Sequence, residues 1–423
     1  MQKPKLKREL GLFEVTLSGI GIILGAGIYA LVGKAAGLAG DAVWISFVIA
    51  ALIAALTGLS YAELSSMYPK AGAEYEYVRN AFGRKLAFLI AWLIIFSGII
   101  GASTVALGFA GYFSALFGGS QISAAILLLV VLSSVLFRGI KESAWLAIAF
   151  TLIEAGGLVI IILIGIPYFG SVNYFEAQSG MGGIFQAAAL IFFAFIGFEE
   201  IVRLSEETKN PERTIPLGLI LSIGVSIVLY TLVAVSCVSV LGWRVLWESN
   251  APLADVASVA FGERAFSVLS LIALCATSNT VLLMLLGTSR IIFGMAESGS
   301  LPSIFSKVHY RTRTPWAAIV FMVVSSAVFV LIGKIELAAN ATNFMVFATF
   351  AAVNLSLIAL RYRKPELQRR FKTPLNIGRF PILPSFGAVF SILMLFNLGI
   401  EAIAIGIALL VLGFLAMVAL RID

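Results

Sequence analysis

Two neighbouring carboxylates, Glu199 and Glu200, stand inside a long apolar run in which residues 193–200 read FAFIGFEE. A third carboxylate, Glu154, lies within another apolar run. A charged carboxylate in hydrocarbon costs about 2.5–3.5 kcal/mol on insertion scales, so each is a candidate functional group. Because protonation removes that charge, such a group can take up a proton, or bind a cation, and carry it across a membrane.

A glycine cluster marks a second unusual segment, because residues 19–27 read GIGIILGAG and hold four glycines in nine residues. Close packing of helices through small residues is one explanation. Unwinding of the helix is the other. All 12 prolines lie in loops or near the ends of apolar runs, so a helix break in mid-membrane has to come from glycine and local backbone strain.

Unwinding at both segments would free backbone groups that suit an amino acid. Amides at the start of a helix favour a carboxylate, and unpaired carbonyls accept an ammonium. No charged side chain is then required for binding. The groups in question are the amides near Gly25, Ala26 and Gly27 and the carbonyls near Ile23, Phe193 and Ile196.

The elements that position these residues are membrane helices. The chain has 423 residues, of which 60% are hydrophobic and 12% charged, and no soluble core of this size could bury so much apolar surface. Apolar runs of roughly 17–25 residues can cross a hydrocarbon layer as helices. We count twelve such runs, at 12–33, 42–66, 86–116, 122–138, 145–168, 183–206, 215–241, 264–296, 316–333, 340–361, 380–398 and 401–421.

Basic residues orient these helices, because Lys and Arg are retained on the cytoplasmic side. If both termini are cytoplasmic, only Lys34, Arg244, Arg264 and Lys334 of the 29 Lys and Arg fall outside. The net charge of +7 therefore reflects topology, and we expect the lipid bilayer as partner and no nucleic acid. We expect a multi-pass protein of the plasma membrane.

The two unusual segments open successive blocks of five apolar runs. This placement is typical of two inverted repeats whose first helices unwind at mid-membrane. We therefore predict an all-α polytopic membrane protein with one transmembrane domain over residues 1–423. The first repeat covers about 12–168, the second about 183–361, and two extra helices cover 380–421.

Three stretches resemble the amino acid–polyamine–organocation (APC) superfamily of transporters: GIGIILGAGIY at 19–29, FFAFIGFEEIVRLSEETKNPERTIP at 192–216 and SRIIFGMAESGSLPSIFSKVHYRTRTP at 289–315. The resemblance extends from about Leu10 to Asp423. It implies the LeuT-like fold, with five-plus-five repeats and broken helices 1 and 6. It also implies secondary transport of amino acids, although the superfamily includes polyamine carriers.

Two positions depart from familiar members of that superfamily. Glu154 occupies the place of a buried lysine that some proton-coupled relatives use in place of sodium. Ser97, five residues after Trp92, replaces a glutamate of cationic amino acid carriers, which favours neutral substrates. Glu199 matches an acidic position that is frequent in relatives, and either Glu199 or Glu200 could still supply a charge for a cationic substrate.

Other polar and aromatic residues in the spans each have two interpretations. Thr277, Ser278 and Asn279 either complete a cation site with carbonyls of the first span or form interhelical hydrogen bonds. Phe195 and Phe198 either close over a substrate or pack in the core. Glu154 either couples transport to an ion or hydrogen-bonds a neighbouring helix.

These observations predict a permease of neutral amino acids that works by alternating access, coupled to protons rather than sodium. A polyamine or cationic amino acid carrier or exchanger, and an amino acid sensor without net transport, are the alternatives. A major facilitator fold suits the breaks less well. No catalytic, metal-binding or cofactor motif is visible, so an enzyme is not expected. The predicted substrate-binding residues are Ile23, Gly25, Ala26, Gly27, Ser97, Phe193, Phe195, Ile196 and Phe198, and the predicted ion-coupling residues are Glu154, Glu199, Thr277, Ser278 and Asn279.

Overall fold

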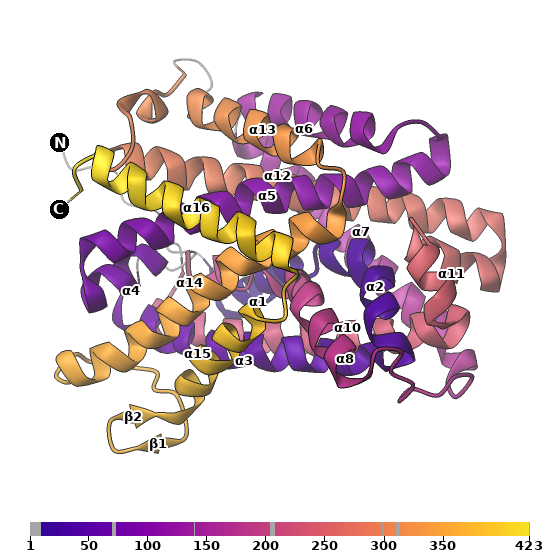
Figure 1. The fold of residues 1–423 in the computed structure, drawn as a ribbon, viewed down its shortest axis with the longest axis horizontal. Helices are drawn as coiled ribbons and strands as arrows, with labels where there is room; N and C mark the ends of the chain where they lie inside the picture. Colours follow the sequence, from indigo (N-terminus) through magenta and orange to yellow (C-terminus); the bar gives the residue numbers. More distant parts are fainter. Residues whose placement is uncertain are drawn as a thin grey trace.

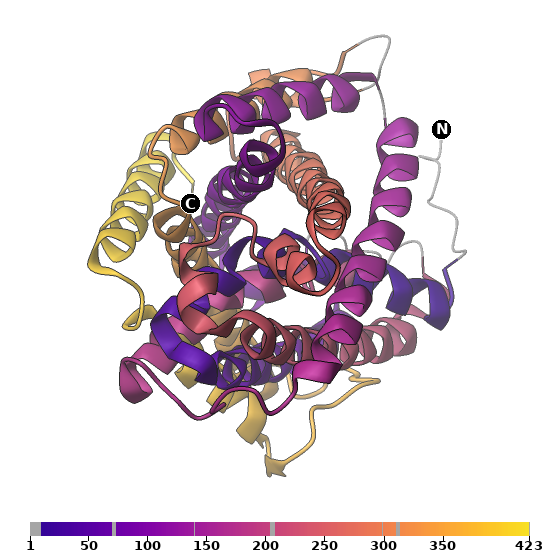
Figure 2. The ribbon, with the colours of Figure 1, turned by 90° about the vertical axis from the view of Figure 1, so that its right-hand side faces the viewer.

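The computed structural model describes residues 10–69, 73–138, 140–203, 208–297, 299–309 and 314–422. Across these ranges the chain is helical apart from short 3₁₀ turns, loops and one small hairpin (Figure 1). Several of the long helices are seen end-on in Figure 2, so they run in similar directions. This is the arrangement expected of a polytopic membrane protein, in which every spanning segment satisfies its own backbone.

Every predicted apolar run coincides with a helix or with consecutive helical segments. In the first half these are α1 (Leu12–Ile23), α2 (Ala26–Ala39), α3 (Val43–Met67), α5 (Arg84–Phe117), α6 (Gln121–Arg138) and α7 (Ile140–Gly165), with 3₁₀ turns at Gly40–Ala42 and Ile166–Tyr168. A further helix, α4 (Ala73–Phe82), lies between the second and third predicted runs.

The second half contains α8 (Gly180–Ile191), the 3₁₀ turn η3 (Phe192–Phe195), α9 (Glu200–Arg203), α10 (Pro211–Glu248), α11 (Pro252–Phe261), α12 (Glu263–Glu297), a 3₁₀ turn at Ser303–Ser306, α13 (Trp316–Val330) and α14 (Ile335–Arg363). The hairpin of β1 (Asn376–Ile377) and β2 (Phe380–Pro381) precedes α15 (Ile382–Leu395) and α16 (Ile400–Ala419).

Eight stretches in the described part of the chain are long and apolar enough to cross a membrane. Shorter apolar helices, α1, α6, α13 and α15 among them, occupy other predicted spans. The count of twelve crossings and the inverted repeat stay predictions. The boundaries differ most in the first span, which continues to Ala39 rather than ending at 33. The seventh begins at Pro211, four residues before the predicted start, and its α10 (Pro211–Glu248) has a kink at Gly242, directly after the predicted end at 241.

The first and sixth predicted spans are the interrupted ones. The first divides into α1 and α2 at Leu24 and Gly25, where Leu24 has ψ 53° and Gly25 is extended at ψ −163°. In the sixth span, α8 is followed directly by the 3₁₀ turn η3, and the chain then turns at Gly197, whose φ is 122°. Only glycine adopts that φ without strain, so the sequence itself determines where this helix stops.

Long helices enclose the two interrupted segments. α10 packs on α3 and α1, and α12 packs on α5 and α7, while α14 lies against α5 and α15. Figure 1 shows α16, α5 and α12 running in nearly the same direction across the molecule. The broken helices are therefore held in the interior, where irregular backbone is shielded from lipid.

Candidate functional site

The two interrupted segments meet backbone to backbone. A Cβ added to Gly27 would lie 2.4 Å from Cα of Ala194 in η3. A Cβ added to Gly197 would lie 3.0 Å from the carbonyl oxygen of Ile22. Any side chain at position 27 would clash with Ala194, because the neighbouring atom belongs to the backbone and cannot move aside. The break in the first span is thus in contact with the break in the sixth.

One tyrosine joins the freed carbonyls of the two breaks. The hydroxyl of Tyr230 in α10 lies 2.5 Å from the carbonyl oxygen of Ile23 and 3.1 Å from that of Ala194. The residue is fully buried, and its ring packs edge-on against Phe195 with centroids 5.2 Å apart. A hydroxyl has a single proton, so it can fully satisfy one of these carbonyls at a time. The other keeps acceptor capacity.

The amides at the start of α2 also have partners from the protein. The Ala26 amide donates to Oγ1 of Thr280 in α12 over 3.0 Å, and the Gly25 amide donates to the Ile23 carbonyl over 2.6 Å. A Cβ on Gly25 would lie 2.7 Å from the same Thr280 oxygen. Thr280 therefore occupies the position where a substrate carboxylate was predicted.

Glu199 and Ser97 line one small cavity. Its volume is about 20 Å³, enough for a water molecule, and its other lining residues are Tyr61, Glu74, Ile94, Val346, Thr349 and Phe350. The Glu199 carboxylate accepts a 2.9 Å hydrogen bond from the Gly197 amide. The carboxylate is thus attached to the break itself, and the fold brings it together with the serine that the sequence singled out in the third span.

Glu154 lies in α7 and is fully buried. Within the described residues, neither of its carboxylate oxygens has a hydrogen-bond partner. Its backbone carbonyl accepts the Tyr29 hydroxyl from α2 at 2.7 Å, so the residue sits beside the broken first span. An unpartnered buried carboxylate is costly as an anion and much less so when protonated or bound to a cation.

The three polar residues of α12 behave differently from one another. Asn279 donates from Nδ2 to Oγ1 of Thr151, one turn before Glu154, over 3.2 Å, and its own oxygen has no partner among the described residues. Thr277 donates to the Ala273 carbonyl of its own helix, and Ser278 is buried. Asn279 is therefore the member of this group placed toward Glu154.

Phe195 and Phe198 are both packed into aromatic clusters. Phe198 lies edge-on to Tyr61 at 5.7 Å and close to Phe350 at 5.1 Å. Both phenylalanines are almost completely buried. The rings are packed among other aromatic side chains, and closure of either ring over a substrate stays a prediction.

Phe193 and Ile196 complete the sixth-span break. The Phe193 carbonyl accepts the Ile196 amide at 3.3 Å, which ends η3. Upstream, Nδ2 of Asn343 in α14 donates to the carbonyls of Ala189 and Leu190 at 2.6 and 3.0 Å. The end of α8 is therefore fixed by a side chain from a distant helix.

Sequence reasoning missed four of these residues: Tyr230, Thr280, Glu74 and Asn343. Thr280 directly follows the Thr-Ser-Asn triplet that was recognised, and Asn343 is one of three asparagines in the predicted span 340–361. Thr280 and Asn343 are polar residues within predicted spans, and this feature of the sequence could have identified them as candidates. Tyr230 gives no comparable signal because it is one of 11 tyrosines and its largely apolar ring suits a packed interior.

A helical membrane protein whose two broken helices meet around backbone groups, with carboxylates nearby, has the site architecture of a membrane transporter. Comparison with known families is in accord: residues 10–419 match the amino acid permease family, and the chain belongs to that family.

The relatives it resembles share most of its length. They include a branched-chain amino acid permease of Bacillus subtilis, 32% identical over 93% of this chain and 89% of the relative. A methylthioribose transporter of the same organism is 30% identical over 93% and 89%. A vacuolar cationic amino acid transporter of Arabidopsis thaliana is 30% identical over 86% of this chain and 61% of the relative.

Proposed function

We propose that this protein is a secondary active transporter of neutral amino acids that works by alternating access and is coupled to protons. The contact between the breaks of the first and sixth spans is the observation that supports it most strongly. Backbone amides and carbonyls near that contact can bind the two ends of an amino acid without a charged side chain. Family membership and the branched-chain permease among its relatives support the amino acid substrate.

Substrate binding in this proposal is an exchange of hydrogen-bond partners. The substrate carboxylate replaces the Thr280 hydroxyl at the Ala26 amide and reaches the neighbouring amide of Gly27. The ammonium replaces the Tyr230 hydroxyl at the Ile23 carbonyl and approaches the carbonyls of Phe193 and Ile196. The free protein then keeps its polar backbone groups satisfied, which limits the cost of an empty site in a dry interior.

The substrate side chain lies among apolar and aromatic groups in this proposal. Phe195 and Phe198 border the break, and Ser97 on α5 contributes a neutral wall. A neutral wall favours a neutral side chain, because a buried cation without a counter-charge is strongly disfavoured.

Proton coupling is assigned to Glu199 and Glu154. Glu199 is bonded to the Gly197 amide, so a change in its charge acts directly on the sixth-span break. Glu154 lacks a side-chain partner among the described residues and lies beside the first-span break. Protonation would remove the cost of moving either carboxylate through a closed state. Asn279, which shares α12 with Thr277 and Ser278, lies on the side of Glu154 in this proposal.

A cationic amino acid is the second candidate substrate. The cavity next to Ser97 holds two carboxylates, Glu199 and Glu74, and among the residues lining it there is no Lys or Arg. Two carboxylates could receive the side-chain charge of lysine or arginine. The resemblance to a cationic amino acid transporter points the same way.

Orientation is part of the proposal. The uneven distribution of Lys and Arg supports cytoplasmic termini and a plasma-membrane location. The five-plus-five repeat, about 12–168 and 183–361, would supply the two units that move relative to each other.

Uptake into proteoliposomes tests the substrate assignment. Labelled leucine should accumulate under an imposed proton gradient, and unlabelled valine and isoleucine should compete more strongly than lysine or glutamate. Accumulation of lysine instead would select the cationic alternative. Binding of leucine without accumulation would identify a sensor and contradict the proposal.

A further inference from the structure

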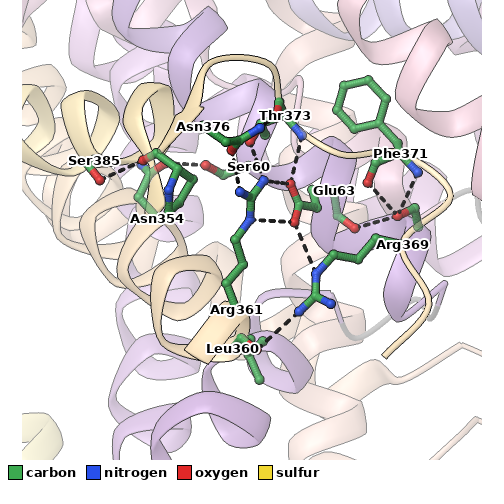
Figure 3. Close-up of polar contacts among 12 residues, drawn as sticks. Ser60, Glu63, Asn354, Leu360, Arg361, Arg369, Phe371, Thr373, Asn376 and Ser385 are labelled. Carbon is green, nitrogen blue, oxygen red and sulfur yellow. Dashed lines mark hydrogen bonds and ion pairs between the residues drawn. The ribbon is translucent and has the colours of Figure 1, made fainter. Parts of the chain in front are cut away.

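The connection between α14 and α15 is fixed to the rest of the protein by a buried ionic network (Figure 3). Arg361 at the end of α14 donates from Nε and Nη2 to the two carboxylate oxygens of Glu63 in α3, at 2.9 and 2.5 Å. Arg369 reaches the same carboxylate at 3.3 Å, and the Thr373 amide donates to it at 2.8 Å. Figure 3 shows these groups converging on Glu63. The loop therefore has a defined position.

The same network fixes the base of the hairpin. Arg361 also hydrogen-bonds Oδ1 of Asn376, the first residue of β1. The Asn376 amide group donates back to the Thr373 carbonyl at 2.7 Å. The base of the hairpin is consequently fixed to the buried network through Asn376.

If α15 crosses the membrane, as the sequence predicts, the chain path puts this hairpin at a membrane surface. β2 ends at Pro381 and α15, an apolar helix, begins at Ile382 without a linker. In Figure 1 the hairpin lies at the periphery of the molecule, at the start of α15. A segment joined directly to the first turn of a membrane helix lies at the depth of the lipid headgroups.

Large apolar side chains of the hairpin are exposed. Leu375 is 64% exposed, Ile377 71% and Phe380 39%. Leu375 also has a left-handed backbone with φ 57°, which costs a leucine roughly 1–2 kcal/mol. Covering the leucine side chain with lipid would offset that cost.

Two basic side chains accompany this apolar surface. Lys372 and Arg379 are exposed and, in the part of the chain that the structure describes, neither makes an ion pair. Arg361 and Arg369 are occupied by Glu63, and Arg370 pairs with Glu212 at 2.5 Å. The outward charge of the hairpin is therefore positive and comes from these two residues.

We infer that the β1–β2 hairpin is a binding surface for anionic phospholipid. Leu375, Ile377 and Phe380 insert between acyl chains near the headgroups, and Lys372 and Arg379 bind the lipid phosphates. Apolar insertion combined with basic residues is the chemistry by which interfacial segments select anionic membranes. The surface anchors the α14–α15 connection and is independent of the transport site.

A spin label at Ile377→Cys measures its depth directly. The label is placed on protein in which Cys237 and Cys275 are replaced by alanine, and collision with oxygen is compared with collision with a water-soluble nickel complex. Nanodiscs contain phosphatidylcholine alone or with phosphatidylglycerol. The label should be lipid-exposed with phosphatidylglycerol and move toward water without it.

Charge variants identify the residues responsible. Lys372→Gln combined with Arg379→Gln should lower the inserted-to-free ratio of the label by roughly thirty-fold, at about tenfold for each 1.4 kcal/mol. Arg264→Gln combined with Lys307→Gln removes two exposed charges elsewhere and should leave the ratio unchanged.

Two results would overturn the inference. One is a label that stays in water in both lipid compositions. The other is a label that inserts equally in both, which would show apolar insertion without recognition of anionic lipid. Spin-labelled phosphatidylglycerol bound by protein with its native cysteines provides a second measurement, and the Lys372/Arg379 variant should release it selectively over spin-labelled phosphatidylcholine.

Discussion

The Tyr230 hydroxyl lies 2.5 Å from the carbonyl oxygen of Ile23, the last residue before the break in the first span. The same hydroxyl is within 3.1 Å of the Ala194 carbonyl in the sixth span. A single side chain from a third helix therefore lies within hydrogen-bonding distance of backbone carbonyls at both breaks and donates to one of them at a time. It compensates in part for the hydrogen bonds that unwinding removes.

Replacing Tyr230 with phenylalanine should remove this bridge while keeping the ring contacts with Phe195 and Phe47. The Ile23 carbonyl keeps its bond from the Gly25 amide at 2.6 Å, whereas the Ala194 carbonyl loses the Tyr230 donor. A buried carbonyl left unsatisfied costs about 1–3 kcal/mol, so the midpoint of thermal unfolding should fall and uptake should decline several-fold. Tyr112→Phe is the matched control, because its hydroxyl donates at 2.9 Å to the Tyr29 carbonyl within α2. Equal loss of uptake in both variants would contradict a specific role for Tyr230.

Thr280→Val should strengthen substrate binding. The variant removes the hydroxyl that occupies the Ala26 amide, so a substrate carboxylate no longer competes with it. We expect about fivefold tighter binding, equivalent to roughly 1 kcal/mol, with lower stability of the empty protein. Substrate-dependent thermal shifts measure both effects.

Thr277→Val serves as the control for Thr280, because the Thr277 hydroxyl bonds only to its own helix in the described structure. It should change binding little. Weaker binding in Thr280→Val would mean that the hydroxyl itself holds the substrate, and the proposed exchange would be wrong.

Gly27→Ala should separate the two breaks. The new methyl would lie 2.4 Å from Cα of Ala194, which is backbone and cannot rotate away. We expect at least a tenfold loss of uptake, measured per folded protein. Gly156→Ala places the same methyl in α7 with no atom within 4 Å, and it should be neutral or slightly stabilising. Normal uptake by Gly27→Ala would refute the close contact.

Glu63→Gln should be strongly destabilising. Glu63 is fully buried and pairs with Arg361, so removing its charge leaves a buried cation without its partner at a cost of about 3–5 kcal/mol. Thermal unfolding in detergent should show a large decrease for this variant and almost none for Glu366→Gln, whose side chain is exposed. Arg361→Lys should also lose stability because it cannot form the two-point contact.

The positions of the helices could be predicted from the sequence because lipid imposes long apolar runs. The breaks could also be located, since Gly197 needs a positive φ and Gly25 and Gly27 lie where other backbone and side chains approach closely. Both are local consequences of residue type.

The partners of the freed backbone groups could not be predicted in this way. Tyr230, Thr280 and Asn343 come from helices far away in the sequence, and which side chain reaches a break depends on helix rotation and packing. The cavity lined by Glu199 and Glu74 also depends on packing between distant segments. Glu74 lies in α4, which is not an apolar run, so the sequence gives no sign that it approaches Glu199. Apolar periodicity contains little information about these contacts.

Leucine uptake driven by a proton gradient in wild-type, Glu199→Gln and Glu154→Gln proteoliposomes tests the central claim most directly. The proposal predicts that wild-type protein accumulates leucine under a proton gradient and not under a sodium gradient. It also predicts that both variants lose accumulation while retaining exchange of leucine between equal concentrations. Full proton-driven accumulation in both variants, or a requirement for sodium, would contradict the account.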